Sequence, residues 1–170
     1  MARNVEIKAR IMDLEALEAR VAELATAGPQ DIVQDDTFFH CTSGRLKLRR
    51  FSASAGELIA YHRADETGPK ISTYRRCPTD HPDDLRDCLA LAHGVAGRVV
   101  KERRLYLAGR TRIHLDRVEG LGTFMELEVV LGETESAEDG EHEARRLMAA
   151  LGIKTDALIE GAYLDLQAPS

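Results

Sequence analysis

The chain has 170 residues, of which 44% are hydrophobic and 31% charged, a composition typical of one ordinary globular domain spanning residues 1–170. Its net charge of −6 and its aromatic content of 5% argue against a general polyanion-binding surface and against base stacking, so we expect no nucleic-acid partner. MARNVEIKAR at the N-terminus lacks the apolar run of a signal peptide, and no stretch approaches the length of a membrane span. We therefore expect a cytoplasmic protein without a membrane partner.

The three cysteines, Cys41, Cys77 and Cys88, are odd in number and far apart. Their spacing matches no metal-binding pattern. We expect buried or half-buried thiols, as in proteins of a reducing compartment.

The first predicted element is a strand over 4–11, NVEIKARI, in which charged and apolar residues alternate with period two. The next is a helix over 14–27, with Asp13 as its N-cap and with Gly28-Pro29 ending it. Four strand-like segments follow, separated by short polar breaks with Gly or Pro that are typical of hairpin loops. They are DDTFFHC (35–41), GRLKLRRF (44–51), ELIAYHR (57–63) and KISTYRR (70–76).

A second helix is predicted over 81–94, with Pro82 near its start and Gly94 at its end. Strands over 97–107, 111–119 and 123–131 come next, then an amphipathic helix over 135–152 and a short final helix over 156–166. Consecutive strands with short connections favour an antiparallel sheet, and eight strands are enough to close a barrel. The sequence therefore predicts an α+β fold, an eight-stranded antiparallel β-barrel with flanking helices.

Basic residues recur at alternate positions of these strands, so several strands each have one positively charged face. For a single strand the simplest explanation is a face in contact with water. Like charges on neighbouring strands repel one another, so the same pattern on several strands is costly unless an anion lies among them. Arg and Lys are the usual phosphate ligands, which points to a bound phosphate chain. The residues are Arg45, Lys47, Arg49, Arg63, Lys70, Arg76, Lys101, Arg103 and Arg112.

Carboxylates are separate from this basic pattern. Glu126 and Glu128 lie two residues apart and project to the same side of one strand, while Glu6 and Asp116 occupy similar positions on others. Oxygen ligands of this kind suit Mg²⁺ or Mn²⁺, and such an ion beside a polyphosphate indicates a phosphoryl- or nucleotidyl-transfer site. The alternative is that Glu126 and Glu128 form ordinary salt bridges with Lys8 or an arginine.

Several short motifs, in this order, give the chain a recognisable pattern. They are N-V-E-I-K (4–8), L-K-L-R (46–49), K-E-R (101–103), H-L-D (114–116), E-L-E (126–128) and EGAYLDL (160–166). With them the chain resembles the CYTH proteins, or triphosphate tunnel metalloenzymes, a family that includes class IV adenylyl cyclases, thiamine triphosphatases and inorganic tripolyphosphatases. The resemblance implies an eight-stranded tunnel that binds a triphosphate-containing small molecule together with Mg²⁺ or Mn²⁺.

The resemblance also implies roles for individual residues. The implied metal ligands are Glu6, Glu126 and Glu128, with Asp116 as a ligand or a water-orienting group, and the implied catalytic residues are these four with Lys8. The implied triphosphate ligands are Lys8, Arg10, Lys47, Arg49, Arg63, Lys70, Arg76, Lys101, Arg103 and Arg112. One position departs from the family motif E-x-E-x-K, because Asn4 stands where its first Glu would be. An amide oxygen can coordinate a metal but brings no charge.

Three functions remain open at this point. The first is a metal-dependent triphosphatase acting on tripolyphosphate or on a nucleoside or thiamine triphosphate. The second is a class IV adenylyl cyclase, which would convert ATP to cyclic AMP and pyrophosphate. The third is a non-catalytic binder of polyphosphates. An enclosed substrate needs an element that opens, for which the helix over 80–94 and the C-terminal helix are candidates. The sequence leaves open whether the chain forms a homodimer.

Overall fold

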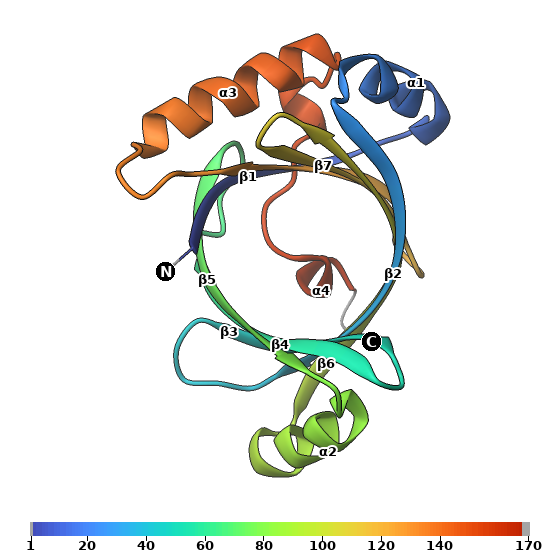
Figure 1. The fold of residues 1–170 in the computed structure, drawn as a ribbon, viewed down its shortest axis with the longest axis vertical. Helices are drawn as coiled ribbons and strands as arrows, with labels where there is room; N and C mark the ends of the chain where they lie inside the picture. Colours follow the sequence, from blue (N-terminus) through green and yellow to red (C-terminus); the bar gives the residue numbers. More distant parts are fainter. Residues whose placement is uncertain (1, 168–170) are drawn as a thin grey trace.

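The computed structural model describes residues 2–167, in which eight antiparallel strands close into a barrel (Figure 1). The order around the barrel is β1-β5-β4-β3-β2-β6-β7-β8. The predicted fold class is therefore confirmed. The strands are β1 (Ala2–Arg10), β2 (Ala27–Phe39), β3 (Arg45–Ser52), β4 (Ala55–Arg63), β5 (Lys70–Thr79), β6 (Val95–Ala108), β7 (Thr111–Val118) and β8 (Gly122–Val130).

The barrel consists of two runs of consecutive strands and one strand between them. Strands β2 to β5 pair in sequence order, and so do β6 to β8. The long strands β2 and β6 pair with each other and join the two runs on one side. Strand β1 pairs with β5 and β8 and closes the other side.

The main hydrophobic core lies outside the barrel wall. Ile7, Ile113 and Leu127 point outward from β1, β7 and β8 and are almost completely buried. They pack under α1 (Leu14–Leu24) and α3 (Ala137–Ala150), which cover one side of the barrel (Figure 1). Burying each such side chain contributes about 1.5–3 kcal/mol. Because this core stabilises the barrel from outside, the inward faces are free to carry polar residues.

The two covering helices begin at side-chain caps. The Asp13 carboxylate accepts a hydrogen bond from the amide of Ala16 at 3.0 Å, as the sequence predicts for the start of α1. The Ser136 hydroxyl accepts one from the amide of Asp139 at 3.2 Å at the start of α3. A Cβ atom at Gly140 would lie 2.7 Å from a side-chain atom of Val5, so the glycine allows α3 to lie directly on β1.

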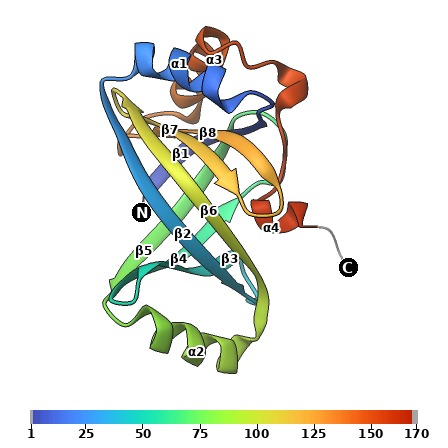
Figure 2. The same ribbon diagram turned by 90° about the vertical axis from the view of Figure 1, so that its right-hand side faces the viewer.

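Helix α2 (Pro82–His93) lies on the opposite side of the barrel and outside its wall (Figures 1 and 2). It contacts β2, β3 and β4, and the Arg50 guanidinium of β3 donates a hydrogen bond of 2.9 Å to the Asp83 carboxylate. The expectation that this helix acts as a lid is wrong, because it packs on the wall and not over an opening.

The largest differences from the predicted elements lie in two segments, the one before β2 and the one at the C-terminus. Helix α1 ends at Leu24, and β2 begins at Ala27, well before the predicted strand start at residue 35. The reason is tertiary, since residues 30–33 pair with 102–105 of the long strand β6. The predicted helix over 156–166 is instead a 3₁₀ turn (Thr155–Ala157), an extended segment and the one-turn helix α4 (Tyr163–Leu166). Gly161, at φ +80°, has the left-handed backbone that breaks this helix.

Two smaller expectations concern cysteines and membranes. All three cysteines are exposed, so the prediction of buried or half-buried thiols is wrong. Over residues 2–167, none of the helices has both the length and the apolar character needed to cross a membrane.

Candidate active site

The inward faces of the barrel enclose a cavity of about 340 Å³. All eight strands contribute side chains to it, and Ala162 and Tyr163 of the C-terminal segment lie at one end. Charged side chains make up about half of the residues that line the cavity, and apolar side chains such as Ile32, Phe51 and Ile59 also face it. The charged lining residues are Glu6, Lys8, Asp36, Lys47, Arg49, Glu57, Arg63, Arg76, Lys101, Arg103, Arg112, Glu126 and Glu128.

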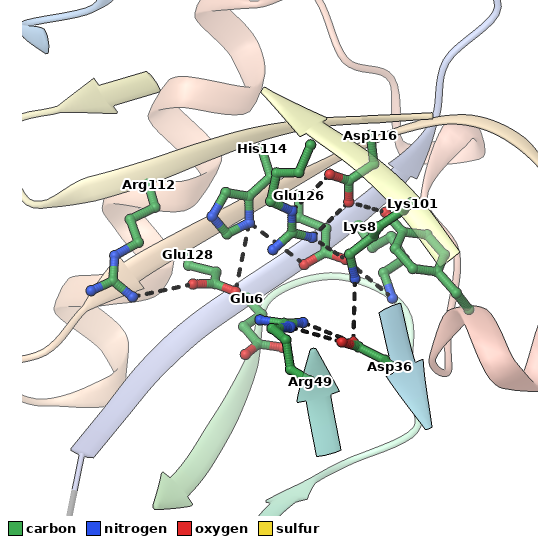
Figure 3. A network of polar contacts seen from close by, with 12 residues as sticks. Glu6, Lys8, Asp36, Arg49, Lys101, Arg112, His114, Asp116, Glu126 and Glu128 are labelled. Carbon is green, nitrogen blue, oxygen red and sulfur yellow. Dashed lines mark hydrogen bonds and ion pairs between the residues drawn. The ribbon is translucent and has the colours of Figure 1, made fainter. Parts of the chain in front are cut away.

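Three carboxylates lie together on the wall formed by β1 and β8. The strand register places Glu6 opposite Glu128 and Lys8 opposite Glu126 (Figure 3). His114 on the neighbouring strand β7 lies opposite Glu126, and one donor atom from each of His114, Glu126 and Glu128 fits within 4.8 Å. Two carboxylates and an imidazole are a donor set that suits a divalent cation.

The pKa values of Glu6 and Glu126 shift in opposite directions because their neighbours differ. Burial raises the pKa of Glu6, and repulsion from Glu128 acts in the same direction, while Arg63 opposes both through a hydrogen bond of 3.0 Å. Burial would also raise the pKa of Glu126, but the charges of Lys8 and Arg103 outweigh it and hold this pKa well below its usual range. Glu126 is therefore ionised at neutral pH.

Another carboxylate, that of Asp36 on β2, lies apart from these three and among three cations in the interior. Its oxygens accept a hydrogen bond of 2.9 Å from Lys47. They also accept hydrogen bonds of 2.8 and 2.9 Å from two nitrogens of Arg49, and Lys101 lies 3.8 Å away (Figure 3). Burial would raise the pKa of Asp36, but these cations hold it well below its usual range. Asp36 thus supplies an anion that holds three predicted phosphate ligands in one place.

Asp116 does not reach the cavity lining. Both of its oxygens accept hydrogen bonds from Arg103, at 2.7 and 2.6 Å, and one also accepts a hydrogen bond of 2.7 Å from the Tyr163 hydroxyl. A carboxylate with these bonds and no exposed surface is a support for Arg103. The same guanidinium nitrogen that bonds Asp116 lies 3.4 Å from Glu126, so Asp116 is behind Arg103 and outside the cavity lining. Its role as a metal ligand or water-orienting group stays a prediction.

Two predicted phosphate ligands also lie away from the cavity. Arg10 is exposed, and its guanidinium donates a hydrogen bond of 3.1 Å to the carbonyl of Leu121. Lys70 is buried, and its ammonium donates one of 2.8 Å to the carbonyl of Glu66. The other eight predicted ligands line the cavity.

Asn4, the position that departs from the family motif, faces the cavity beside Glu6. Its side chain is 2% exposed, and its carbonyl oxygen Oδ1 has no hydrogen-bond partner among the described residues. The amide thus occupies the position of the missing carboxylate with a free acceptor atom.

The C-terminal segment closes one end of the cavity. Tyr163 packs against Phe124, with ring centroids 4.9 Å apart, and belongs to a small apolar cluster with Phe38, Val99 and Val118. The Lys8 ammonium lies 4.0 Å from the Tyr163 ring centroid and donates a hydrogen bond of 3.3 Å to the carbonyl of Gly161. The Arg45 guanidinium, which pairs with Asp165 at 2.7 Å, holds α4 at this end (Figure 1).

Sequence reasoning missed Asp36 and Tyr163. Asp36 could have been found from the alternation of side-chain direction along the strand, since it shares one face of β2 with Gln34 and Phe38. Tyr163 lies in a segment without a repeating pattern, and only the motif EGAYLDL pointed to it.

Comparison with known proteins agrees with this architecture. The PH1012 protein of Pyrococcus horikoshii is 22% identical, with 96% of this chain covering 98% of that protein at a TM-score of 0.85. A putative adenylate cyclase of Vibrio parahaemolyticus is 16% identical. The match covers 97% of this chain and 98% of that protein, with a TM-score of 0.78. A putative adenylyl cyclase of Hippeastrum, described as having a dominant triphosphatase activity, is 15% identical. The match covers 95% of this chain and 91% of that protein, with a TM-score of 0.65. At these identities the likeness shows the fold alone.

A search among curated proteins finds no match to this sequence. The pattern that defines the CYTH domain, however, matches residues 2–163, which is nearly the whole chain. With the closed barrel and its charged interior, this match shows that the chain belongs to the CYTH family.

Proposed function

We propose that this protein is a divalent-metal-dependent triphosphatase that hydrolyses a phosphoanhydride bond of tripolyphosphate or of an organic triphosphate inside the barrel. The observation that carries the proposal is the distribution of charge in one cavity inside the barrel. Basic side chains from several strands face carboxylates on β1 and β8 across about 340 Å³. The dominant triphosphatase activity described for the Hippeastrum protein, which has the same fold, supports hydrolysis as the first activity to test.

The cations would bind the phosphate chain. Arg49 and Lys47 lie on β3 and Lys101 on β6, so phosphate oxygens entering between them would receive charge-assisted hydrogen bonds from both sides. Burial lowers the pKa of Lys101, and the charge of Arg103 acts in the same direction, so an arriving anion would stabilise its protonated form. Phosphate oxygens would then replace part of the hydrogen bonding and charge pairing that Asp36 provides to Lys47, Arg49 and Lys101.

Glu126 and Glu128, with Glu6 beside them, would hold the divalent cation. When bound, this cation would neutralise phosphate charge and favour attack at phosphorus. Glu6 would orient the attacking water, because Arg63 occupies its Oε2 and leaves Oε1 available. The water would form a bond to the terminal phosphorus while the bond to the bridging oxygen breaks, which releases phosphate and the shortened chain.

The test uses tripolyphosphate, ATP and thiamine triphosphate, each with Mg²⁺ or Mn²⁺, and separates the products by chromatography. Hydrolysis of tripolyphosphate to phosphate and diphosphate, or of an organic triphosphate to its diphosphate, supports the proposal. Cyclic AMP and pyrophosphate from ATP would instead identify a class IV adenylyl cyclase. If no triphosphate is cleaved, and Glu126→Gln leaves tripolyphosphate affinity unchanged, the protein is a non-catalytic polyphosphate binder.

Neighbouring arginines on β3 provide the matched variants. Arg49 faces the cavity, whereas Arg50 pairs with Asp83 of α2 on the outside. Arg49→Gln should lower kcat/KM by about 100-fold, because a charge that stabilises the transition state is lost. Arg50→Gln should change it by no more than about twofold, since exposed pairs contribute little. Equal losses in both variants would contradict a reaction inside the barrel.

A further inference from the structure

One buried nitrogen of the cavity wall has no partner. His114 is 4% exposed, and its Nδ1 makes no hydrogen bond within residues 2–167. The imidazole points toward two carboxylates, with Nδ1 3.8 Å from Glu126 Oε2 and 3.7 Å from Glu128 Oε1 (Figure 3). These distances exceed those of hydrogen bonds, so the buried nitrogen is aimed at two acceptors without bonding to either.

A metal ion between the three groups would satisfy all of them. Ligands bound about 2.1 Å from a central ion lie about 3 Å apart when adjacent and about 4.2 Å apart when opposite. The three donor atoms fit within 4.8 Å of one another, so small inward movements of the side chains reach this geometry. The pairing of β7 with β8 places His114 directly opposite Glu126, which limits how far the imidazole can move away.

The same carboxylates are only loosely engaged by cations. Lys8 and Arg103 lie 3.5 and 3.4 Å from Glu126, and Arg112 lies 3.7 Å from Glu128. None of these contacts is a hydrogen bond within the described residues, in contrast to the short bonds at Asp36 and Asp116. An arriving metal ion would therefore displace no hydrogen bond from Glu126 or Glu128.

We infer that His114 is a nitrogen ligand of the divalent-metal site, together with Glu126 and Glu128, and that the site prefers Mn²⁺ to Mg²⁺. Mg²⁺ binds almost entirely through oxygen, whereas imidazole nitrogen is a better ligand for transition-metal ions. A site with two carboxylates and one imidazole thus gains affinity for Mn²⁺ that Mg²⁺ does not share. The inference rests on the divalent-metal part of the proposed function and adds the identity of the metal.

The experiment measures coordination directly, with Mn²⁺ alone as the probe and no substrate. Metal-free protein is loaded with Mn²⁺ and studied by pulsed electron paramagnetic resonance, which detects a directly bound nitrogen through its hyperfine coupling. We expect a ¹⁴N coupling in the natural protein, replaced by a ¹⁵N coupling when only histidine carries ¹⁵N. Mn²⁺ bound without nitrogen coupling would overturn the inference, and so would a failure of Mn²⁺ to bind.

Two glutamine variants assign the nitrogen. His114→Gln should abolish the coupling and lower Mn²⁺ affinity at least about tenfold, as expected for the loss of a group that supports a metal. Mg²⁺ affinity, measured by competition against Mn²⁺, should change less than about threefold. His142→Gln, at an exposed position on α3, should behave like the natural protein. A coupling that persists in folded His114→Gln would overturn the inference, and the labelled natural protein decides the outcome if this variant does not fold.

The result is distinguishable from a failure of the proposed function. Hydrolysis of tripolyphosphate with Mn²⁺, in a protein whose bound Mn²⁺ has no nitrogen coupling, would overturn this inference and leave the triphosphatase proposal standing. Nitrogen coupling from His114 without hydrolysis of any triphosphate would support the inference and contradict the triphosphatase proposal.

Discussion

Asp35 and Asp36 are neighbours on β2 that face opposite sides of the barrel wall. Asp35 accepts two hydrogen bonds of 2.7 Å from Arg98, whose side chain is mostly exposed on the outer surface. Asp36 is 1% exposed and is surrounded by three cations. The outer aspartate has one partner that water can replace, whereas the inner one neutralises a group of charges that are largely buried.

Arg103 and Arg104 on β6 show the same difference. Arg104 pairs on the outside with Asp31 and Glu18, and its side chain is 42% exposed. Arg103 is 5% exposed, and the Asp116 carboxylate beside it raises the pKa of its guanidinium, although burial acts in the opposite direction. The comparison teaches that residue type and hydrogen-bond length do not reveal the energetic weight of an ion pair, which depends on whether water can take the place of the partner.

The largest expected effect comes from removing the inner arginine. Arg103→Gln should lower the free energy of unfolding by about 3–5 kcal/mol, because Asp116 is left buried without its cation. Arg104→Gln should lower it by about 1 kcal/mol or less, since water can solvate the exposed Asp31. Urea unfolding followed by circular dichroism measures both, and similar losses in the two variants would contradict the comparison.

The second prediction concerns the pH dependence of stability that the inner aspartate, Asp36, causes. The pKa of Asp36 is lower in the folded protein than in the unfolded chain. At a pH between these two pKa values, the unfolded chain therefore binds more protons than the folded protein does. The stability that ionised Asp36 contributes is therefore complete above the range in which an unperturbed Asp titrates, about pH 4, and is lost as the pH falls below it.

Substitution should expose this contribution. Asp36→Asn should be less stable than the natural protein at pH 7, and its stability should fall less steeply with pH below about pH 4. Urea unfolding at a series of pH values tests the prediction, and an unchanged acid profile in Asp36→Asn would exclude Asp36 as the titrating group.

The smallest expected effect compares two tyrosine hydroxyls. Tyr163 donates a hydrogen bond of 2.7 Å to buried Asp116, and Tyr106 donates one of 2.7 Å to partly exposed Glu18 on the outside. Tyr163→Phe should cost about 1.5–3 kcal/mol, and Tyr106→Phe only about 0.5–1 kcal/mol, because water can replace the outer donor. Thermal unfolding of both variants provides the comparison, and a larger loss in Tyr106→Phe would reverse the assignment of inner and outer contacts.

Alternation along the strands predicted which residues face inward. In β1 it separates Val5 and Ile7, which are buried under the helices, from Glu6 and Lys8, which line the cavity. This inference is secure because strand side chains alternate strictly and a closed barrel has only two faces. The closed barrel itself was predictable from the number of strands and the short loops between them.

Alternation contains no information on the depth of a residue along the barrel. Asp116 and Glu126 share the inward face, but the register pairs Asp116 with Arg103 and Phe124, which directs it to the arginine. Register depends on how neighbouring strands fit together, and a single strand sequence does not state it. For the same reason Tyr163, which reaches Asp116 from a distant segment, could not be placed from the sequence.

The position of β1 between β5 and β8 has a consequence for biosynthesis. Strand β1 leaves the ribosome before β8 and cannot acquire this partner until the segment between them has been made. Until then its apolar outward face and unpaired backbone are exposed, which is a condition that favours aggregation. Contacts so distant in sequence also slow folding, because a long loop must close before they form. Glu6 and Glu128 meet only at this closure, so a nascent or truncated chain lacking β8 would lack the proposed metal site.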